Sequence, residues 1–239
     1  MTPTASPSWF VDELAHAGRE NLDAGHVARY DAKEDADAPA EVALLRELGL
    51  TADSVLVDLG AGTGQLTLAV ASHCARVVAV DVSPVMLERL QRKITASGLT
   101  NVELVRAGFL SYQHRAEPGA AADVVYSRYA LHHLPDFWKA MALVRIRRML
   151  APGGLFRLWD VVYDFAPDEA EQRLEAWCAT GGDSVDVEWS RAEIEEHVRD
   201  EHSTFSWVLE PMLERAGFEI ITARRSADHL FSAYVLRAA

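Results

Sequence analysis

The sequence predicts an α/β protein with a Rossmann-like, mostly parallel sheet and helices on both faces. Short β-branched runs alternate with helical patterns along the middle of the chain, which is typical of βαβ units with right-handed crossovers. A glycine-rich turn directly follows the first of these runs. The 239 residues suffice for one such domain with an elaboration, and hardly for two full domains.

Seven strands are expected, and helices are expected between them. The strands are 54–59, 76–81, 101–106, 123–127, 155–162, 218–223 and 231–236. Helices are expected after the glycine turn through residue 71, over 84–97, over 135–150 and near 206–216. Ser83 is a typical N-cap, Pro84 a typical first helical residue, and Gly98 a typical stop.

Two segments fall outside this alternation, and both have helical patterns. In residues 1–50 we expect one helix around 9–17 and another around 38–48. In residues 163–208 we expect helices near 167–178 and 191–199. We interpret residues 1–50 as an N-terminal helical lid and 163–208 as a cap inserted into a domain that spans 51–239. These segments are the best candidates for substrate contacts.

The charge balance indicates the kind of partner. With 23 basic and 36 acidic residues the net charge is −13, so nucleic acid and anionic membranes would be repelled. A small-molecule substrate is therefore expected, and a homodimer is compatible with the sequence. The start of the chain does not resemble a signal peptide, and Cys74 and Cys178 are expected to be reduced, which predicts a cytoplasmic protein.

The glycine turn points to the ligand. Gly60, Gly62 and Gly64 follow a Gly-x-Gly-x-Gly pattern, one residue shorter than the dinucleotide fingerprint. Asp58 just before the turn disfavours a diphosphate and suits an ammonium group. Asp81, at the end of the second strand, can accept hydrogen bonds from ribose hydroxyls. A ribose and an ammonium group without phosphates describe S-adenosylmethionine, which makes a nicotinamide enzyme the weakest reading.

Four motifs in this order resemble class I S-adenosylmethionine-dependent methyltransferases. They are VLVDLGAGTGQ, VVAVDVSPVML, NVELVRAGFL, and DVVYSRYALHHLPD followed by LAPGGLFRLWD. The resemblance covers about residues 40–160 and is greatest to the small-molecule group that includes the ubiquinone and menaquinone biosynthesis methyltransferases. It implies a seven-stranded sheet of order 3-2-1-4-5-7-6 with a reversed final hairpin.

The resemblance also implies the cofactor contacts. The methionine part would contact Asp58, Gly60, Gly62 and the backbone of Ser127; Asp81 would bind the ribose; Val82 and Met86 would flank the adenine; and Tyr30 would close over the cofactor. Gly108 and Phe109 occupy the place where the family often has an acidic acceptor for the adenine amino group. Capping of the glycine-loop helix by Asp58, a pure core role for Met86 and a packing role for Tyr30 remain open alternatives.

Candidate catalytic bases are His132, His133 and His197. Candidate acceptor-binding residues are Arg128, Arg199, His202 and Trp177. The alternatives are pairing of Arg128 with an acidic neighbour, a structural role for one of the paired histidines, a solvated helix end around 197–202 and a packing role for Trp177. No metal site is expected, because histidines at 197 and 202 do not share one helical face.

The predicted function is transfer of the methyl group from S-adenosylmethionine to an oxygen, nitrogen or carbon atom of a small molecule. A general base is optional, because the cofactor's sulfonium is already an excellent leaving group. One alternative is an intramolecular cyclase that consumes the cofactor and releases methylthioadenosine. Another is a non-catalytic cofactor-binding partner subunit.

Overall fold

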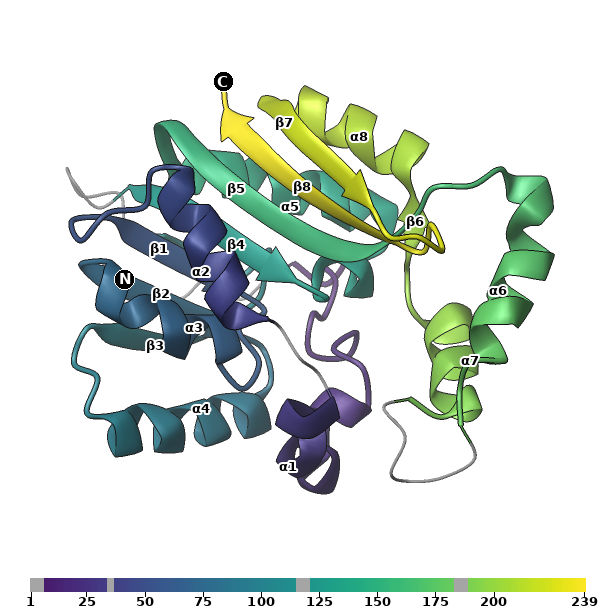
Figure 1. The fold of residues 1–239 in the computed structure, drawn as a ribbon, viewed down its shortest axis with the longest axis horizontal. Coiled ribbons are helices and arrows are strands. Elements are labelled where there is room, and N and C mark those ends of the chain that lie inside the picture. The colour runs from purple at the N-terminus through teal and green to yellow at the C-terminus, as the bar shows by residue number, and fades with distance from the viewer. Residues whose placement is uncertain (1–6, 34–36, 115–120, 183–188) are drawn as a thin grey trace.

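A computed structural model describes residues 7–33, 37–114, 121–182 and 189–239, and within them the chain forms an eight-stranded sheet (Figure 1). The strands are β1 Val55–Leu59, β2 Arg76–Asp81, β3 Val102–Arg106, β4 Ala122–Arg128, β5 Leu150–Tyr163, β6 Thr204–Phe205, β7 Phe218–Arg225 and β8 Phe231–Ala238. The order is β3-β2-β1-β4-β5-β8-β7, with the two-residue β6 paired to β5. Leaving β6 aside, this is the predicted order 3-2-1-4-5-7-6, and β8 is antiparallel to both of its neighbours, as predicted.

Most of the helices lie where the apolar periodicity of the sequence predicts them. They are α1 Ala24–Lys33, α2 Ala38–Glu47, α3 Gln65–Val70, α4 Pro84–Ser97, α5 Asp136–Met149, α6 Ala170–Cys178, α7 Arg191–Asp200 and α8 Ser206–Arg215. Short 3-10 turns cover Glu20–Leu22, Ala71–His73, Leu131–His133 and Pro167–Glu169. The predicted cap of α4 is confirmed, because the Ser83 hydroxyl accepts a hydrogen bond from the Met86 N–H at 3.2 Å.

Helices cover both faces of the sheet. On one face α2 and α3 pack Leu45 and Val70 onto the sheet, and α4 packs Leu90 against Ala79. On the other face α5 and α8 contribute Leu143, Ile146, Leu209 and Leu213. Because β1, β2 and β4 are covered on both sides, they read as nearly continuous apolar runs in the sequence.

The expectation of a helix around 9–17 is wrong. This segment consists of turns, and the first α-helix begins only at Ala24. The Asp12 carboxylate accepts hydrogen bonds from the N–H groups of Leu14 and Ala15, which offers the backbone an alternative to a helix. Phe10 packs against Trp138 with ring centroids 5.0 Å apart, so tertiary contacts hold the segment in this shape. The sequence pattern could not distinguish this apolar packing from that of a helix.

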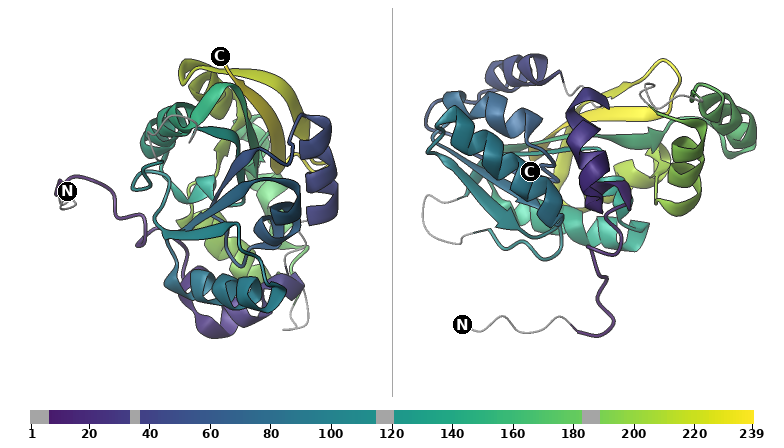
Figure 2. Two further views of the ribbon diagram at one scale, coloured as in Figure 1. Left: turned by 90° about the vertical axis from the view of Figure 1, so that its left-hand side faces the viewer. Right: turned by 90° about the horizontal axis from the view of Figure 1, so that it is seen from below.

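The strand expected to begin at residue 155 begins at Leu150, because Leu150 pairs with Ala122 ahead of an irregular register in β4. The expected cap contains α6 and α7, which lie beyond the end of β5, away from the helices that cover the two faces (Figure 1). Figure 2 shows α1 beside α4. Residues 1–6 and 34–36 of the expected lid and 183–188 of the expected cap lie outside the described residues.

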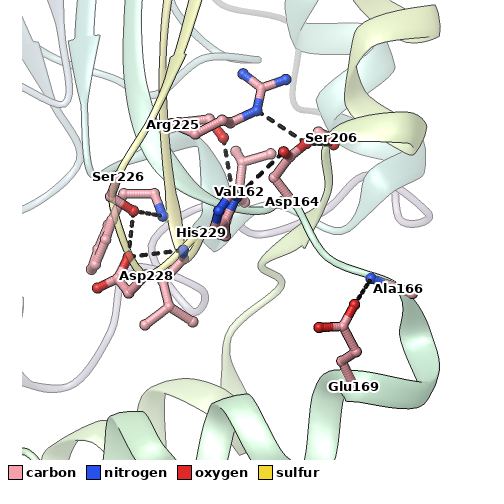
Figure 3. Close-up of polar contacts among 12 residues, drawn as sticks. Val162, Asp164, Ala166, Glu169, Ser206, Arg225, Ser226, Asp228 and His229 are labelled. Atoms are coloured by element: carbon pink, nitrogen blue, oxygen red, sulfur yellow. Dashed lines mark hydrogen bonds and ion pairs between the residues drawn. The ribbon is translucent and has the colours of Figure 1, made fainter.

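Polar contacts at Asp164 fix the junction between β5, α8 and the β7–β8 hairpin (Figure 3). The Ser206 hydroxyl donates to the Asp164 carboxylate at 2.5 Å, and Arg225 forms an ion pair with it at 3.0 Å. These contacts, led by the Ser206 hydrogen bond, hold the pKa of Asp164 below its usual value. The chain on either side of α6 and α7 is thereby anchored to the sheet. Among the described helices, none combines the length and apolar character that a membrane span requires.

Candidate active site

A cleft opens at the carboxyl ends of β1, β2 and β4. It comprises two adjoining cavities, which share Tyr30, Gly60, Gly62, Arg128 and Tyr129. The carboxyl edge is where open α/β sheets bind ligands. We use the word cleft for these two cavities together.

The glycine turn shapes the floor of the cleft. Gly60, Gly62 and Gly64 have φ values of 73°, 54° and 85°, in the left-handed region that favours glycine. A Cβ on Gly60 would lie 2.3 Å from the Cβ of Ala130, and one on Gly64 would lie 2.1 Å from the Leu90 side chain. The Gly62 N–H donates to the Asp81 carboxylate at 2.8 Å and so joins the turn to the end of β2. The glycines are thus required by conformation and by close packing.

Two acidic residues end β1 and β2 beside this turn. Asp58 is buried, with its carboxylate accepting a hydrogen bond from the Thr67 hydroxyl at 2.6 Å. Burial raises the pKa of Asp58 to about 7, and the nearby charge of Asp81 adds to the shift. Burial also raises the pKa of Asp81, whose carboxylate accepts from the N–H groups of Gly62 and Ser83. The pair is therefore a costly concentration of negative charge, which a cationic ligand group would relieve.

An unsatisfied hydroxyl lies in the same part of the cleft. Tyr126 lines the smaller cavity together with Asp58, and its buried hydroxyl has no hydrogen-bond partner within the described part of the chain. A buried polar group without a partner costs about 1–3 kcal/mol, so a polar ligand here would remove a penalty. The cavity fits a ligand that has both a hydrogen-bond acceptor and a positively charged group.

The N-terminal segment closes the cleft from the side of α1. Tyr30 lines both cavities, and its Cε1 lies 4.0 Å from the Cβ position of Gly62. The neighbouring Asp31 carboxylate accepts a hydrogen bond from the Thr63 hydroxyl and pairs with Lys93 at 2.7 Å. Helix α1 is thus tied to the glycine turn and to α4. A lid formed by residues 1–50 stays a prediction.

Glu13 is a cleft residue that the sequence analysis missed. Its carboxylate accepts hydrogen bonds from the N–H groups of Leu110 and Ser111 at 2.8 and 2.9 Å. A Cβ on Gly108 would lie only 2.3 Å from the Glu13 Oε1 atom. A carboxylate therefore lies beside Gly108, although the local sequence has none. Nothing in the local pattern signals this contact, because about one hundred residues separate Glu13 from Ser111.

The other residues predicted to contact the adenine also line the larger cavity. Val82, Met86, Gly108 and Phe109 all do so. Met86 is 2% exposed and packs in the core while it also lines the cavity, and its contact with the adenine stays a prediction. Ser127 is fully buried within β4, and its predicted backbone contact stays a prediction.

The three histidines predicted as bases lie close together, but their surroundings differ. His133 lines the cleft. His132 is buried between two carboxylates: its Nδ1 bonds to Asp160, and its Nε2 lies 2.8 Å from Glu201 Oε2. His197 Nδ1 lies 2.6 Å from the same Glu201 oxygen. We call His132, His133, Asp160, His197 and Glu201 the histidine–carboxylate cluster.

Charge within the cluster shifts its pKa values strongly. Burial alone would lower the pKa of His132, but Asp160 and Glu201 outweigh it and raise the pKa to about 10. Burial and the charge of His132 lower the pKa of His133 to about 3, which leaves this imidazole neutral. Burial opposes ionisation of Glu201, but His132 and His197 hold its pKa well below the usual range. The protonated His132 therefore lies between two carboxylates and stabilises both of them.

The predicted acceptor-binding residues do not come together. Arg128 lines the cleft, with its guanidinium over the rings of Tyr129 and Trp159 at 4.8 and 4.4 Å. Trp177 instead packs against His197, with ring centroids 5.3 Å apart. Arg199 is exposed and pairs with Asp200, and the His202 ring lies 5.5 Å from the ring of His16. Acceptor contacts of Arg199, His202 and Trp177 stay predictions.

The strand order and the cleft define a Rossmann-like methyltransferase fold, and comparisons with known proteins agree. Residues 56–154 match the family model "Methyltransferase domain". The carboxy-S-adenosyl-L-methionine synthase of Pseudomonas putida strain W619 is 30% identical over 172 residues, which are 66% of this chain and 69% of that protein. The trans-aconitate 2-methyltransferase of Methylobacterium radiotolerans is 33% identical over 131 residues, 54% of this chain and 46% of that protein.

A solved S-adenosylmethionine-dependent methyltransferase from Clostridium acetobutylicum has the same fold. It superimposes with a TM-score of 0.67 at 15% identity, covering 90% of this chain and 97% of that one. The chain therefore belongs to the class I S-adenosylmethionine-dependent methyltransferases. Its cofactor is S-adenosylmethionine. The Tyr126 hydroxyl, which has no partner among the residues that the structure describes, and the uncompensated Asp58–Asp81 pair fit a cofactor with a carboxylate, an ammonium group and a ribose.

Proposed function

We propose that this protein transfers the methyl group of S-adenosylmethionine to a small acidic molecule bound in the cleft. The observation that carries the proposal is the pair of buried carboxylates, Asp58 and Asp81, on either side of a glycine turn that tolerates no Cβ at Gly60. This combination supports a ligand with an ammonium group near β1 and hydroxyls near β2.

The smaller cavity suits the methionine part of the cofactor. Asp58 would accept a hydrogen bond from the ammonium group, and the Tyr126 hydroxyl would gain the partner it lacks. Asp81 would accept from the ribose hydroxyls while keeping the Gly62 N–H. Tyr30 lies where it would cover the bound cofactor.

The larger cavity suits the adenine. Val82, Met86 and Phe109 supply apolar walls. We assign to Glu13 the acceptor for the exocyclic amino group, because its carboxylate lies against Gly108, where the family often has an acidic residue. Its two oxygens already accept from backbone N–H groups, and a carboxylate has further lone pairs for the amino group.

Arg128 and His133 are the polar residues that support an acidic acceptor. Both line the cavity that also holds the adenine-side residues, and a guanidinium suits a carboxylate. The similarity to a trans-aconitate 2-methyltransferase favours the same class of acceptor. A cytoplasmic location and a homodimer stay predictions of the sequence.

When bound, the cofactor supplies an electrophilic methyl group on a sulfonium leaving group. The protein then has to align the acceptor with that methyl group and exclude water. Tyr30 and the N-terminal segment would close one side of the cleft, and Arg128 would orient the acceptor. His133 is the neutral imidazole at the cleft, and it would accept a hydrogen bond from an acceptor that carries a hydroxyl or N–H group.

Product analysis tests this function. The protein is incubated with S-adenosylmethionine and a panel of small di- and tricarboxylic acids, and the nucleoside products are separated. We expect S-adenosylhomocysteine in amounts that depend on the acceptor, and less of it for Arg128→Met. Methylthioadenosine without an acceptor would instead indicate the cyclase, and cofactor binding with no product would indicate a non-catalytic subunit.

A second candidate is modification of the cofactor itself. The similarity to a carboxy-S-adenosyl-L-methionine synthase favours it, and a guanidinium beside the cleft would suit a carboxylic acid that releases carbon dioxide, which would replace one proton of the cofactor's methyl group. A cofactor product heavier than S-adenosylmethionine in the same assay would identify this reaction.

A further inference from the structure

The histidine–carboxylate cluster brings together side chains from three separate parts of the chain. His132 and His133 come from the 3-10 turn Leu131–His133, Asp160 from β5, and His197 and Glu201 from the end of α7. One ligand atom each of His132, His133 and Glu201 lies within 4.8 Å of the other two. Imidazole nitrogen and carboxylate oxygen are the ligands that divalent transition metals such as zinc prefer when thiolates are absent.

The spacing around Glu201 is that of a coordination sphere. Its Oε2 atom lies 2.6 Å from His197 Nδ1, 2.8 Å from His132 Nε2 and 3.9 Å from His133 Nδ1. In a tetrahedral zinc site with ligand distances near 2.0–2.1 Å, neighbouring ligand atoms are about 3.3 Å apart. The observed separations bracket this value, so a small movement of the Glu201 side chain would make room for an ion.

The second nitrogen of two imidazoles is already held. His132 Nδ1 bonds to the Asp160 carboxylate, and His197 Nε2 lies 3.0 Å from the Ser203 hydroxyl. Metal-binding histidines almost always have such a partner on the nitrogen that faces away from the ion, because it fixes the ring and its tautomer. The His132 nitrogen that faces Glu201 is thus the one placed to coordinate, and an ion bound there would displace its proton.

A network of hydrogen bonds alone accounts for the cluster less well. Three imidazole nitrogens approach one carboxylate oxygen, and His133 Nδ1 is buried without a hydrogen-bond partner among the described residues. A buried donor or acceptor in this state is a penalty, which a metal ligand bond would remove. A structural ion pair between His132 and Asp160 needs neither His133 nor His197.

We propose that His132, His133 and Glu201 bind one divalent transition metal ion of the zinc type, with Asp160 orienting His132 and His197 positioning Glu201. The spacing of the histidines at 197 and 202 predicts no metal site, so this proposal departs from the expectation drawn from the sequence. The ligands come together only when α7 packs against the turn that follows β4.

The site lies next to the cleft, because His133 lines it. An ion held there would polarise an acceptor hydroxyl or carboxylate and lower the pKa of the hydroxyl, as metals do for bound water. This use of the ion rests on the proposed function, whereas binding of the ion does not.

Titration of the metal-free protein with zinc tests the site. The full chain is stripped with a chelator, and zinc binding is measured by calorimetry without cofactor or acceptor. We expect one ion per chain. Glu201→Gln should weaken binding by about a hundredfold or more, and Asp160→Asn by about ten- to a hundredfold. His73→Asn, outside the cluster, is the matched control and should bind zinc like the wild type.

Cobalt gives a second readout. Substitution with Co²⁺ should produce visible absorption bands of the intensity seen for four- or five-coordinate ions, and Glu201→Gln should lose them. Thermal unfolding checks that each variant is folded. If the wild type binds no stoichiometric zinc, or if Glu201→Gln binds it equally well, the cluster is an ion-pair network and the proposal is wrong. Neither result depends on methyl transfer, so the proposed function is tested separately.

Discussion

Two buried groups of charges lie at the carboxyl edge of the same sheet, and they are balanced in opposite ways. At β1 and β2, Asp58 and Asp81 take their hydrogen bonds from a hydroxyl and from backbone N–H groups, and burial raises both pKa values. In the histidine–carboxylate cluster, imidazoles face the carboxylates, and the pKa of Glu201 is lowered while that of His132 rises to about 10.

The difference separates a site that lacks a cation from one that holds its own cation, the protonated His132. Buried charge is tolerated when it is matched, and the mismatch around Asp58 is a cost to the free protein that a ligand with an ammonium group removes. Stability measurements should therefore give opposite signs in the two regions.

The largest expected effect on stability is in the histidine–carboxylate cluster. In the metal-free protein His132→Ala leaves Asp160 and Glu201 buried without their shared partner, which should lower the free energy of unfolding by about 3–5 kcal/mol. Urea unfolding at pH 7.5 measures this. His202→Ala, next to the cluster, should cost less than about 1 kcal/mol. Equal losses in the two variants would contradict the assignment of charge pairing to His132.

At the Asp58–Asp81 pair, Asp58→Asn should raise the free energy of unfolding. Because the folded-state pKa of Asp58 is about 7 and its usual value is 3.8, the folded wild type holds a proton that the unfolded chain releases. The stabilisation is complete below about pH 4 and is lost as the pH rises to 7, with a linked free energy on the order of 4 kcal/mol. The variant should therefore gain stability relative to the wild type between pH 5 and 7.5.

Urea unfolding of both proteins at several pH values gives this difference directly. Thr67→Val is a useful companion, since it removes the hydrogen bond that opposes the shift and should move the transition to higher pH. A difference that does not change with pH would mean that Asp58 is ionised throughout.

Asp81→Ala should have a smaller effect than these two changes, and the effect concerns the binding of the cofactor. Loss of charge-assisted hydrogen bonds to the ribose should weaken S-adenosylmethionine binding by about 2–3 kcal/mol. Calorimetry measures the affinity, and thermal unfolding shows whether loss of the Gly62 contact has disturbed the turn. Unchanged affinity in a folded variant would refute the ribose assignment.

The smallest effect concerns Glu13. The wild type should prefer S-adenosylhomocysteine about tenfold over its inosine analogue, which has a carbonyl in place of the adenine amino group. In Glu13→Ala this preference should fall to near one. Comparing two ligands cancels the effect of losing the bonds to Leu110 and Ser111. A preference that survives in the variant would assign the amino group to another acceptor.

Most of the sheet follows from the sequence, because its signals are local. The runs at 54–59 and 76–81 are apolar on both faces, Ser83 and Gly98 bound α4, and the glycine turn needs conformations that other residues avoid. The positions of Asp58 and Asp81 are consequences of the same pattern. A residue at the end of a parallel strand lies at the ligand-binding edge wherever the rest of the chain goes.

The rest was decided by tertiary structure. The turns at 9–17 exist because Phe10 packs on Trp138 and Glu13 bonds to the loop after β3, partners that lie far away in the chain. In the same way, Glu201 meets His132 only because α7 packs against the turn after β4. Local patterns fix the conformation of a segment and the edge it faces, but a contact between distant segments depends on how whole elements pack. The sequence alone thus determined the fold and the two acidic residues at the strand ends, while packing determined the conformation of residues 9–17 and the buried histidine–carboxylate cluster.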